Sequence, residues 1–181
     1  MTTVCLGWGS LYWDPGEMPF QGDWHYDGPE LPLEFARHSG GDRVTLVFVA
    51  GARVVPTLWR EVDAPDLETA ARALAERERI KDMRWIGSWP TLPHRTADEY
   101  TAIVREWANL RPIDGVVWTA LRPRWSRENG RVPELSEVLQ YLKGLSPEAL
   151  DSAAEYIRKA PGQIETKYRA TLNESLKSLG R

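Results

Sequence analysis

The sequence predicts a mixed α+β protein of a single domain, and three observations favour this class. The chain has 181 residues, which suffices for one hydrophobic core and is short for two ordinary domains. Strand-like segments fill its first part and helix-like segments its last part. They do not alternate in the order typical of a doubly wound parallel sheet. We expect one domain over residues 1–181, with strands and the first helices in 1–121 and helices in 135–179.

The chain opens with a strand and a glycine turn. Residues 3–6 form a short apolar run that stops at Gly7, and Trp8 and Gly9 follow, a pattern that predicts a strand leading into a tight turn. Residues 12–29 are rich in proline, glycine and aromatic side chains and show no sustained period. This segment is too long for a simple connection, so we expect a loop with the character of a lid.

Further strands are expected before residue 60. Apolar and polar residues alternate over 31–35, and the proline within this run predicts an edge strand. The Gly-Gly-Asp sequence at 40–42 predicts a turn. Two runs rich in β-branched residues, 44–49 and 54–59, then predict a hairpin.

Two helices are predicted in the middle of the chain, because apolar residues recur there at intervals of three and four. The first has Asp66 as its N-cap, and its apolar positions are Leu67, Ala70, Ala71 and Leu74. The second begins at a capping box of Thr96 and Glu99, and its apolar positions are Tyr100, Ile103, Val104 and Trp107.

One more strand and three helices are expected in the last part of the chain. The strand covers residues 113–121, and a loop rich in arginine and proline follows over 122–133. The first helix covers 135–142 and ends at a glycine, the second begins at a Ser-Pro pair, and the last covers 164–176.

Composition excludes several classes of protein. Hydrophobic residues make up 42% and charged residues 27% of the chain, as in a soluble globular protein. No run approaches the roughly 20 apolar residues of a membrane-spanning helix, and no secretory signal is visible at the start. We therefore expect a cytoplasmic protein. Its net charge of -3 gives no general attraction to nucleic acid.

No cofactor or metal site is expected from the motifs. The turn after the first strand lacks the third glycine of a dinucleotide fingerprint, and Pro15 prevents the helix that this motif requires. His25, His38 and His94 lie far apart without metal-ligand spacing. The single cysteine, Cys5, cannot form an intrachain disulfide and is interpreted as a small core residue.

The glycine turn itself is a candidate binding site. A strand that ends in closely spaced glycines exposes successive N–H groups, and these can bind a carboxylate or an oxyanion without a charged side chain. The alternative is a simple tight turn.

Glu78 is the candidate catalytic residue. At 100° per residue along the first helix, Leu74 and Glu78 lie on the apolar face and Glu76 lies on the opposite face. Burial disfavours the charged form of a carboxyl, so we expect a raised pKa that suits a general acid or base. The alternatives are that the helix ends after Leu74, or that Glu78 pairs with Arg77 or Arg79.

These two features together resemble a known family. After the first strand the chain continues with Gly7-Trp8-Gly9-Ser10-Leu11-Tyr12-Trp13-Asp14-Pro15-Gly16. The segment resembles the opening of γ-glutamyl cyclotransferase-like proteins, in which the first strand leads into Tyr-Gly-Ser-Leu or Tyr-Gly-Ser-Asn, followed in ChaC-type members by Met-Trp-x-Pro-Gly. Leu58-Trp59 and the helix end at Leu74-Ala75-Glu76-Arg77-Glu78-Arg79-Ile80 are similar to its valine-tryptophan strand and its Leu-Asp-Glu-Gln-Glu-Gly-Val helix.

The resemblance implies a fold and an activity. The fold is a small mixed β-barrel with peripheral and C-terminal helices. In the reaction, the α-amino nitrogen of a γ-glutamyl substrate attacks its own γ-carbonyl, which closes 5-oxoproline and releases an amine without a cofactor. Glu78 falls on the family's acid/base glutamate, and Trp8, Gly9, Ser10 and Leu11 would hold the glutamyl group. The expected partner is a small γ-glutamyl compound, and the chain is expected to be a monomer or a homodimer.

The chain departs from the family pattern at three places. Trp8 replaces the usual tyrosine of the turn, Arg79 replaces the glycine after the glutamate, and a later tyrosine has no match nearer than Trp85. These departures leave open which γ-glutamyl compound is the substrate. They also leave open a non-catalytic module that binds a ligand or a protein on the same barrel. A third hypothesis is nucleic-acid binding by the basic loop at 122–131 with its Trp125.

Overall fold

The computed structural model describes residues 1–93 and 99–181. Within these residues the chain forms five α-helices and two five-stranded sheets, so the mixed α+β class is confirmed. The chain divides into two compact units, one of Met1–Leu31 with Pro56–Leu121 and the other of Pro32–Val55 with Arg122–Arg181. The single domain expected over 1–181 stays a prediction. None of the described helices has the length and hydropathy of a membrane span.

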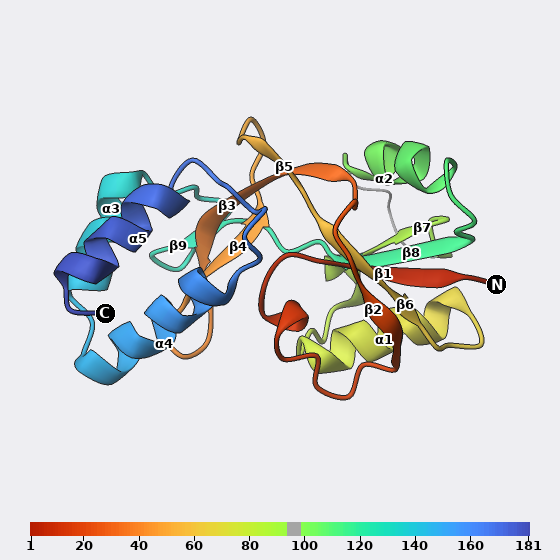
Figure 1. Ribbon diagram of the computed structural model, residues 1–181, viewed down its shortest axis with the longest axis horizontal. Coiled ribbons are helices and arrows are strands. Elements are labelled where there is room, and N and C mark those ends of the chain that lie inside the picture. Colours follow the sequence, from red (N-terminus) through yellow and green to blue (C-terminus); the bar gives the residue numbers. More distant parts are fainter. Residues whose placement is uncertain (94–98) are drawn as a thin grey trace. The chain divides into compact units, whose positions relative to one another are not determined.

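The sheet of the first unit is built around its amino-terminal strand (Figure 1). Its order is β2 (Phe20–His25), β6 (Leu58–Val62), β1 (Thr3–Gly7), β8 (Gly115–Thr119) and β7 (Ile86–Trp89). β1 and β8 run parallel, and the other neighbouring strands pair antiparallel. In this register Cys5 lies between Arg60 and Val117. β1 is therefore hydrogen-bonded on both sides, and its end fixes where the glycine turn leaves the sheet.

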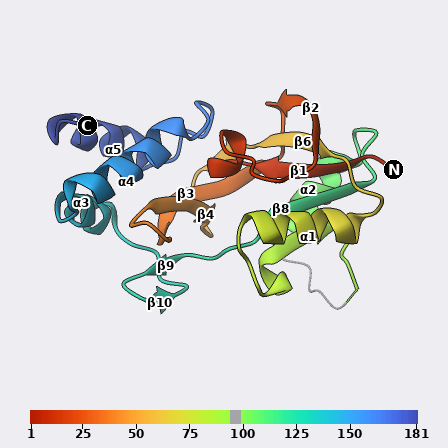
Figure 2. The ribbon, with the colours of Figure 1, turned by 90° about the horizontal axis from the view of Figure 1, so that it is seen from below.

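Two helices cover opposite faces of this sheet (Figures 1 and 2), α1 (Leu67–Arg77) and α2 (Thr101–Ala108). Asp66 caps α1 as the sequence predicts, because its carboxylate accepts a hydrogen bond of 2.7 Å from the amide of Thr69. The expected α2 is also present, but it begins at Thr101 with Tyr100 as its N-cap. The predicted capping residue Thr96 lies outside the described residues.

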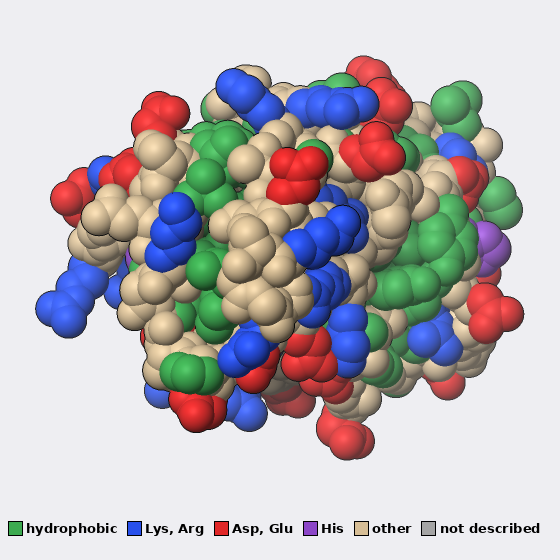
Figure 3. Space-filling model, turned by 60° about the vertical axis from the view of Figure 1, so that its left-hand side comes forward, with side chains coloured by type: hydrophobic (Ala, Val, Ile, Leu, Met, Phe, Trp, Pro, Cys, Tyr) green, Lys and Arg blue, Asp and Glu red, His purple; other side chains and the backbone are tan. Residues whose placement is uncertain are grey.

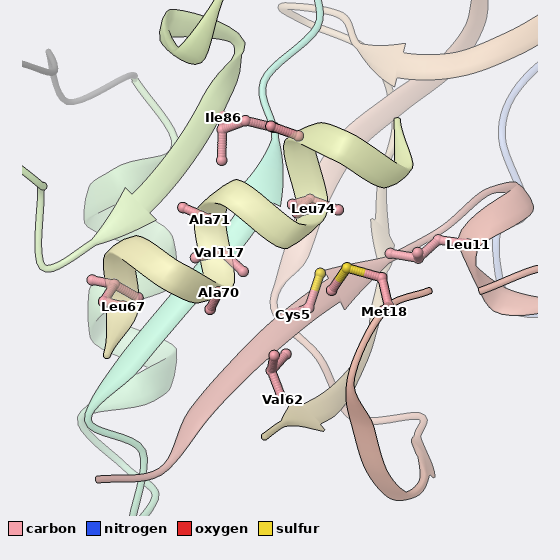
Figure 4. Packing of buried hydrophobic residues seen from close by; sticks show 11 residues of the cluster. Cys5, Leu11, Met18, Val62, Leu67, Ala70, Ala71, Leu74, Ile86 and Val117 are labelled. Carbon is pink, nitrogen blue, oxygen red and sulfur yellow. The ribbon is translucent and has the colours of Figure 1, made fainter. Parts of the chain in front are cut away.

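α1 packs on the sheet through small side chains. Ala70 and Ala71 are fully buried, and Leu74 is fully buried beside them, so the helix backbone approaches the sheet closely. Figure 4 shows these residues facing Cys5 of β1 and Val117 of β8. The apolar face predicted for the helix is thus the core of the first unit. On the sheet's other side, close packing requires Gly87, where an added Cβ would lie 2.1 Å from the Trp118 ring.

The second sheet lies mostly in the second unit. Its order is β10 (Glu128–Asn129), β9 (Arg124–Trp125), β3 (Glu30–His38) and β4 (Val44–Phe48), with β5 (Val54–Pro56) also paired to β3. The helices of this unit are α3 (Leu135–Lys143), α4 (Pro147–Lys159) and α5 (Arg169–Ser178). Ser146 caps α4 by accepting from the amide of Ala149, as the Ser-Pro pair predicts. The last helix begins at Arg169, later than the expected residue 164.

Several expectations about strands were wrong. β4 and β5 do not pair with each other in the described residues; both pair with β3, so the hairpin turn is the one at 40–42 between β3 and β4. β3 is therefore not an edge strand. β3 is buried on both faces, and Glu34 is buried like its neighbours Leu33 and Phe35, so the alternation of polar and apolar residues indicated neither an exposed face nor an edge position.

The segment 12–29 is not one continuous loop, because it contains β2. Four of the six residues of β2 are exposed, as expected for a strand at the sheet edge, so its sequence lacks a hydrophobic period. β7 and the short strands β9 and β10 also lack strong sequence signals. In the described residues neither sheet closes on itself, so the expected barrel is not confirmed.

His38 is enclosed by aromatic rings in the second unit. Its ring centroid lies 3.6 Å from that of Trp125 and 4.1 Å from that of Tyr141. Nε2 is buried and has no hydrogen-bond partner among the described residues. Burial lowers the pKa of His38 below 6.5; the carboxylate of Asp42 opposes this shift and Arg124 adds to it.

Leu74→Ala should destabilise the protein by about 2–5 kcal/mol, because it removes a fully buried side chain and leaves a cavity between α1 and the sheet. Urea unfolding followed by circular dichroism measures this change. The matched control is Glu76→Ala on the exposed side of the same helix, which should stay within about 0.5 kcal/mol of the wild type. Equal effects of the two substitutions would contradict the packing of α1.

The neutral form of His38 should stabilise the fold. Because its pKa is lowered in the folded protein, the unfolded chain binds more protons, and stability is lost as the pH falls through 6.5. We expect the urea midpoint to fall between about pH 7.5 and pH 5.5, and to fall less in His38→Phe, which keeps the ring packing without a titratable group. Identical pH dependence in both proteins would argue against this role.

Candidate active site

The turn after β1 presents unused backbone donors. A short 3-10 helix covers Ser10–Tyr12 with Gly9 as its N-cap. Tyr12 donates its amide to the Gly9 carbonyl at 3.0 Å, and the next two amides donate to the Ser10 carbonyl. The amides of Gly9, Ser10 and Leu11 precede this pattern and donate to no hydrogen bond among the described residues. The first N–H groups of a helix have no acceptor within it, so the amides of this turn can donate hydrogen bonds to an anionic or carbonyl oxygen of a ligand.

The four residues predicted to bind substrate are placed differently by the fold. The side chains of Trp8 and Leu11 are each only 5% exposed, so their indole and isobutyl groups belong to the protein interior. Ser10 is partly exposed, and Gly9 has no side chain. Only the main chain of this turn and the Ser10 hydroxyl are therefore suited to contact a ligand.

Glu78 lies directly at the end of α1. The helix ends at Arg77, and Glu78 is its C-cap. Its side chain is 21% exposed, whereas Glu76 is exposed. Helical spacing predicts opposite sides for these two carboxylates, and their different exposures agree with this prediction. Glu78 is half-buried at a helix end and does not lie deep in the apolar face.

The chain after Glu78 closes the helix in a Schellman motif. Ile80 donates its amide to the Ala75 carbonyl at 2.8 Å, and Arg79 donates to the Glu76 carbonyl at 3.0 Å. Arg79 therefore adopts the left-handed conformation, with φ of 54°. Glycine adopts this conformation without steric cost, and a residue with a Cβ does not. A glycine at this position, as in the resembling family, would be the unstrained choice.

Arg77 connects Glu78 to the turn. Its side chain is only 9% exposed. Nη1 donates to a carboxylate oxygen of Glu78 and, at 3.2 Å, to the hydroxyl of Ser10. Nη2 donates to the same hydroxyl at 3.2 Å and to the main-chain carbonyl of Asp14. One guanidinium thus brings the carboxylate of α1 within two hydrogen bonds of the turn after β1.

This arrangement answers the question that the sequence left open at Glu78. The carboxylate forms an ion pair with Arg77, one of the two arginines considered as its partners. Sequence reasoning named Arg77 only in that role and missed its contacts with Ser10 and Asp14. The one available signal was its place beside Glu78 at the end of a helix, because contacts between residues 67 positions apart leave no trace in a local pattern.

Cys5 lies in the core behind these groups. Its side chain is fully buried, and burial raises the pKa of its thiol well above the usual range; the charge of Glu78 raises it further, and Arg77 opposes this effect. A thiol that stays protonated is a poor nucleophile. Cys5 therefore fits the interpretation as a core residue.

The aromatic side chains of the segment 12–29 pack on one another. The hydroxyls of Tyr12 and Tyr26 lie 2.9 Å apart, and the ring of Trp24 lies 5.8 Å from that of Tyr12 and 5.3 Å from that of Phe20. β2 is also hydrogen-bonded to β6. These contacts favour the packing role of the aromatic residues, and a lid motion stays a prediction.

Trp59, part of the Leu58-Trp59 strand that resembles the family's valine-tryptophan strand, forms a hydrogen bond with Asp27. Its indole Nε1 donates to the carboxylate of Asp27 at 2.8 Å, and Arg111 donates to the other oxygen of that carboxylate at 2.8 Å. The Arg111 and Trp59 hydrogen bonds hold the pKa of Asp27 below its usual range. This cluster ties the end of β2 to β6 and to the segment after α2.

The aromatic residue of the basic loop at 122–131, Trp125, is buried and does not face solvent. Trp125 is 3% exposed and lies against His38, so it is not available to stack on a base. Arg131 pairs with Glu137 at 2.5 Å and with Glu128 at 3.7 Å. Figure 3 shows basic side chains next to acidic ones over the face that it displays.

No group of three or more His, Cys, Asp or Glu side chains with the geometry of a metal site occurs in the part of the chain that the structure describes. His94 lies outside that part.

Comparisons with known proteins find little. No family model matches the chain, and no curated protein matches it. Among solved structures, the chain is similar to a γ-glutamyl cyclotransferase specific to glutathione from yeast, with 14% identity over 100% of both chains and a TM-score of 0.47. At this identity and TM-score, the likeness by itself assigns no activity.

Because Cys5 is fully buried, its thiol should not react with a chromogenic aromatic disulfide in the native protein. One equivalent should react after unfolding in urea, since the chain has one cysteine. The absorbance of the released thiolate measures both states. Rapid reaction under native conditions would contradict the packing of α1 over β1.

Proposed function

We propose that the protein is a γ-glutamyl cyclotransferase-like enzyme that converts a γ-glutamyl amine or peptide into 5-oxoproline and a free amine. The observation that carries the proposal is the shared contact at Arg77, whose Nη1 reaches both Glu78 and Ser10. Arg77 and Ser10 are 67 positions apart in sequence, and their contact makes the Glu78 carboxylate and the donor-rich turn neighbours. The sequence resemblance assigns both of them to one reaction.

The roles follow from the chemistry of ring closure. Glu78, as the carboxylate, takes a proton from the α-ammonium of the substrate. The freed nitrogen attacks the γ-carbonyl carbon and forms the new C–N bond of the ring, while the amides of Gly9, Ser10 and Leu11 bind the developing oxyanion. The bond to the leaving nitrogen then breaks, and that nitrogen receives the proton from Glu78. The ring nitrogen loses its second proton through the regenerated Glu78 carboxylate, so the products are the neutral lactam and the ammonium form of the released amine. The nucleophile is part of the substrate, so proximity supplies much of the acceleration.

Arg77 has a positioning role in this scheme. Its guanidinium holds the Glu78 carboxylate at the edge of the turn in the free protein. A bound ammonium would take over part of this contact, because both cations seek the same oxygens. The hydrogen bonds of Arg77 to Ser10 and Asp14 meanwhile keep the turn in place.

The conformation of Arg79 supports the alignment with the family. The family has a glycine directly after its catalytic glutamate, and here the residue after Glu78 has a φ of 54°, in the region that glycine favours. The backbone therefore keeps the shape for which glycine is suited, although the side chain differs.

The second candidate function is a non-catalytic binding module, and the ion pair itself favours it. The Glu78 carboxylate already has a cationic partner, so a ligand that only adds hydrogen bonds to the turn could bind without any proton transfer. The Arg77 contact is compatible with both functions, and turnover separates them.

Purified protein should release 5-oxoproline from at least one member of a panel of γ-glutamyl amino acids, γ-glutamyl amines and glutathione. Glu78→Gln should lower kcat by about 100-fold or more, since it removes the proton acceptor. Chromatographic detection of 5-oxoproline provides the measurement.

Glu76→Gln is the matched control and should retain full activity, because Glu76 is exposed on the other side of the helix. Thermal stabilisation by a γ-glutamyl compound without turnover would favour the binding module. Neither turnover nor stabilisation across the panel would reject both candidates.

A further inference from the structure

The second unit contains a pocket that the proposed reaction does not use. Its volume is about 660 Å³, within the range of sites that bind small molecules. The loop between β4 and β5 and the segment that leads into α5 form most of its wall. None of its lining residues belongs to the candidate active site.

A buried carboxyl lines the pocket. Glu34 lines it and is only 3% exposed. Oε1 accepts a hydrogen bond of 2.8 Å from the amide of Phe35, and Oε2 accepts one of 3.2 Å from the amide of Tyr168. The main-chain amides of Phe35 and Tyr168 therefore hold the two oxygens of this carboxylate in place.

The surroundings of Glu34 make a cationic partner favourable. Burial raises its pKa, although the nearby Thr166 hydroxyl and the amides of Phe35, Tyr168 and Lys167 oppose this shift. Thr166 is also buried, and its Oγ1 has no partner of hydrogen-bond geometry in the described part of the chain. An ammonium group beside Glu34 would offset the desolvation of the negative charge.

Two basic residues also line the pocket. Arg53 and Lys167 are both exposed, and neither forms an ion pair among the described residues. Val49, Ala52 and Val132 add apolar side chains to the lining. The lining therefore combines one buried carboxyl, apolar side chains and two exposed cations.

We propose that this pocket binds a small zwitterion of dipeptide size, with its ammonium group at Glu34 and its carboxylate between Arg53 and Lys167. The burial difference between Glu34 and the two cations gives the orientation. A single small amino acid would leave much of the 660 Å³ to water, and an apolar side chain on the ligand fits the valine and alanine wall. A ligand of one charge would leave either Glu34 or the two cations without a partner.

The test uses L-alanyl-L-leucine and its two capped forms on the full-length protein. The N-acetyl form lacks the ammonium group, and the C-terminal amide lacks the carboxylate. Isothermal titration calorimetry should show saturable binding of the free dipeptide, and each capped form should bind about tenfold or more weakly, because it lacks one of the two charged groups that form charge-assisted hydrogen bonds.

Variants then locate the binding. Arg53→Ala and Lys167→Ala should each weaken binding of the dipeptide at least several-fold; both side chains are exposed, so the fold should survive. Lys177→Ala is the matched control, an exposed lysine of α5 outside the pocket, and should bind like the wild type. Glu34→Gln should weaken binding of the dipeptide while leaving binding of its N-acetyl form unchanged.

Equal affinity for the three peptide forms, no saturable binding of the free dipeptide, or wild-type affinity in both the Arg53 and Lys167 variants would each overturn the proposal. None of these results depends on 5-oxoproline formation, because no residue of the pocket belongs to the proposed catalytic site.

Discussion

Close packing of α1 against β1 and β8 determines where the candidate functional groups of the first unit lie. The contact face of the helix is largely alanine, and Ala70 and Ala71 are fully buried, so the helix axis approaches the sheet as closely as its backbone permits. The helix end and the strand end then fall next to each other. Larger residues on this face would push the helix outward and separate Glu78 from the turn.

The guanidinium of Arg77 connects the end of α1 to the turn after β1. Burying a cation is costly unless its donors find partners, and here a carboxylate, a hydroxyl and a main-chain carbonyl supply them. The same contacts make the turn and the helix end one hydrogen-bonded assembly. The contact with Arg77 holds the Glu78 carboxylate through Oε1. Its other oxygen, Oε2, is then available to a ligand.

The sequence predicted the features that depend on neighbouring residues along one helix. The Asp66 cap, the apolar face of α1 and the exposure of Glu76 all follow from spacing along one helix. The sequence could not predict which strands are neighbours. β3 pairs with β4, β5 and β9, and periodicity contains no information on pairing. The role of Arg77 was missed for the same reason, because its contacts with Ser10 and Asp14 join residues that are 67 and 63 positions apart. The pocket at Glu34 was also missed, because a single acidic residue in a strand gives no sign of the arginine and lysine that line the same pocket.

The parallel pairing of β1 with β8 has a consequence for how the chain matures. Thr3 lies opposite Gly115 in this pair, so the centre of the first sheet cannot form until well over half of the polypeptide has left the ribosome. The segment from Pro32 to Val55 belongs to the other unit and must wait longer still for its carboxyl-terminal partners. Neither unit is contiguous in sequence, so during synthesis the edge of β1 that later pairs with β8 stays unpaired even after β6 has emerged.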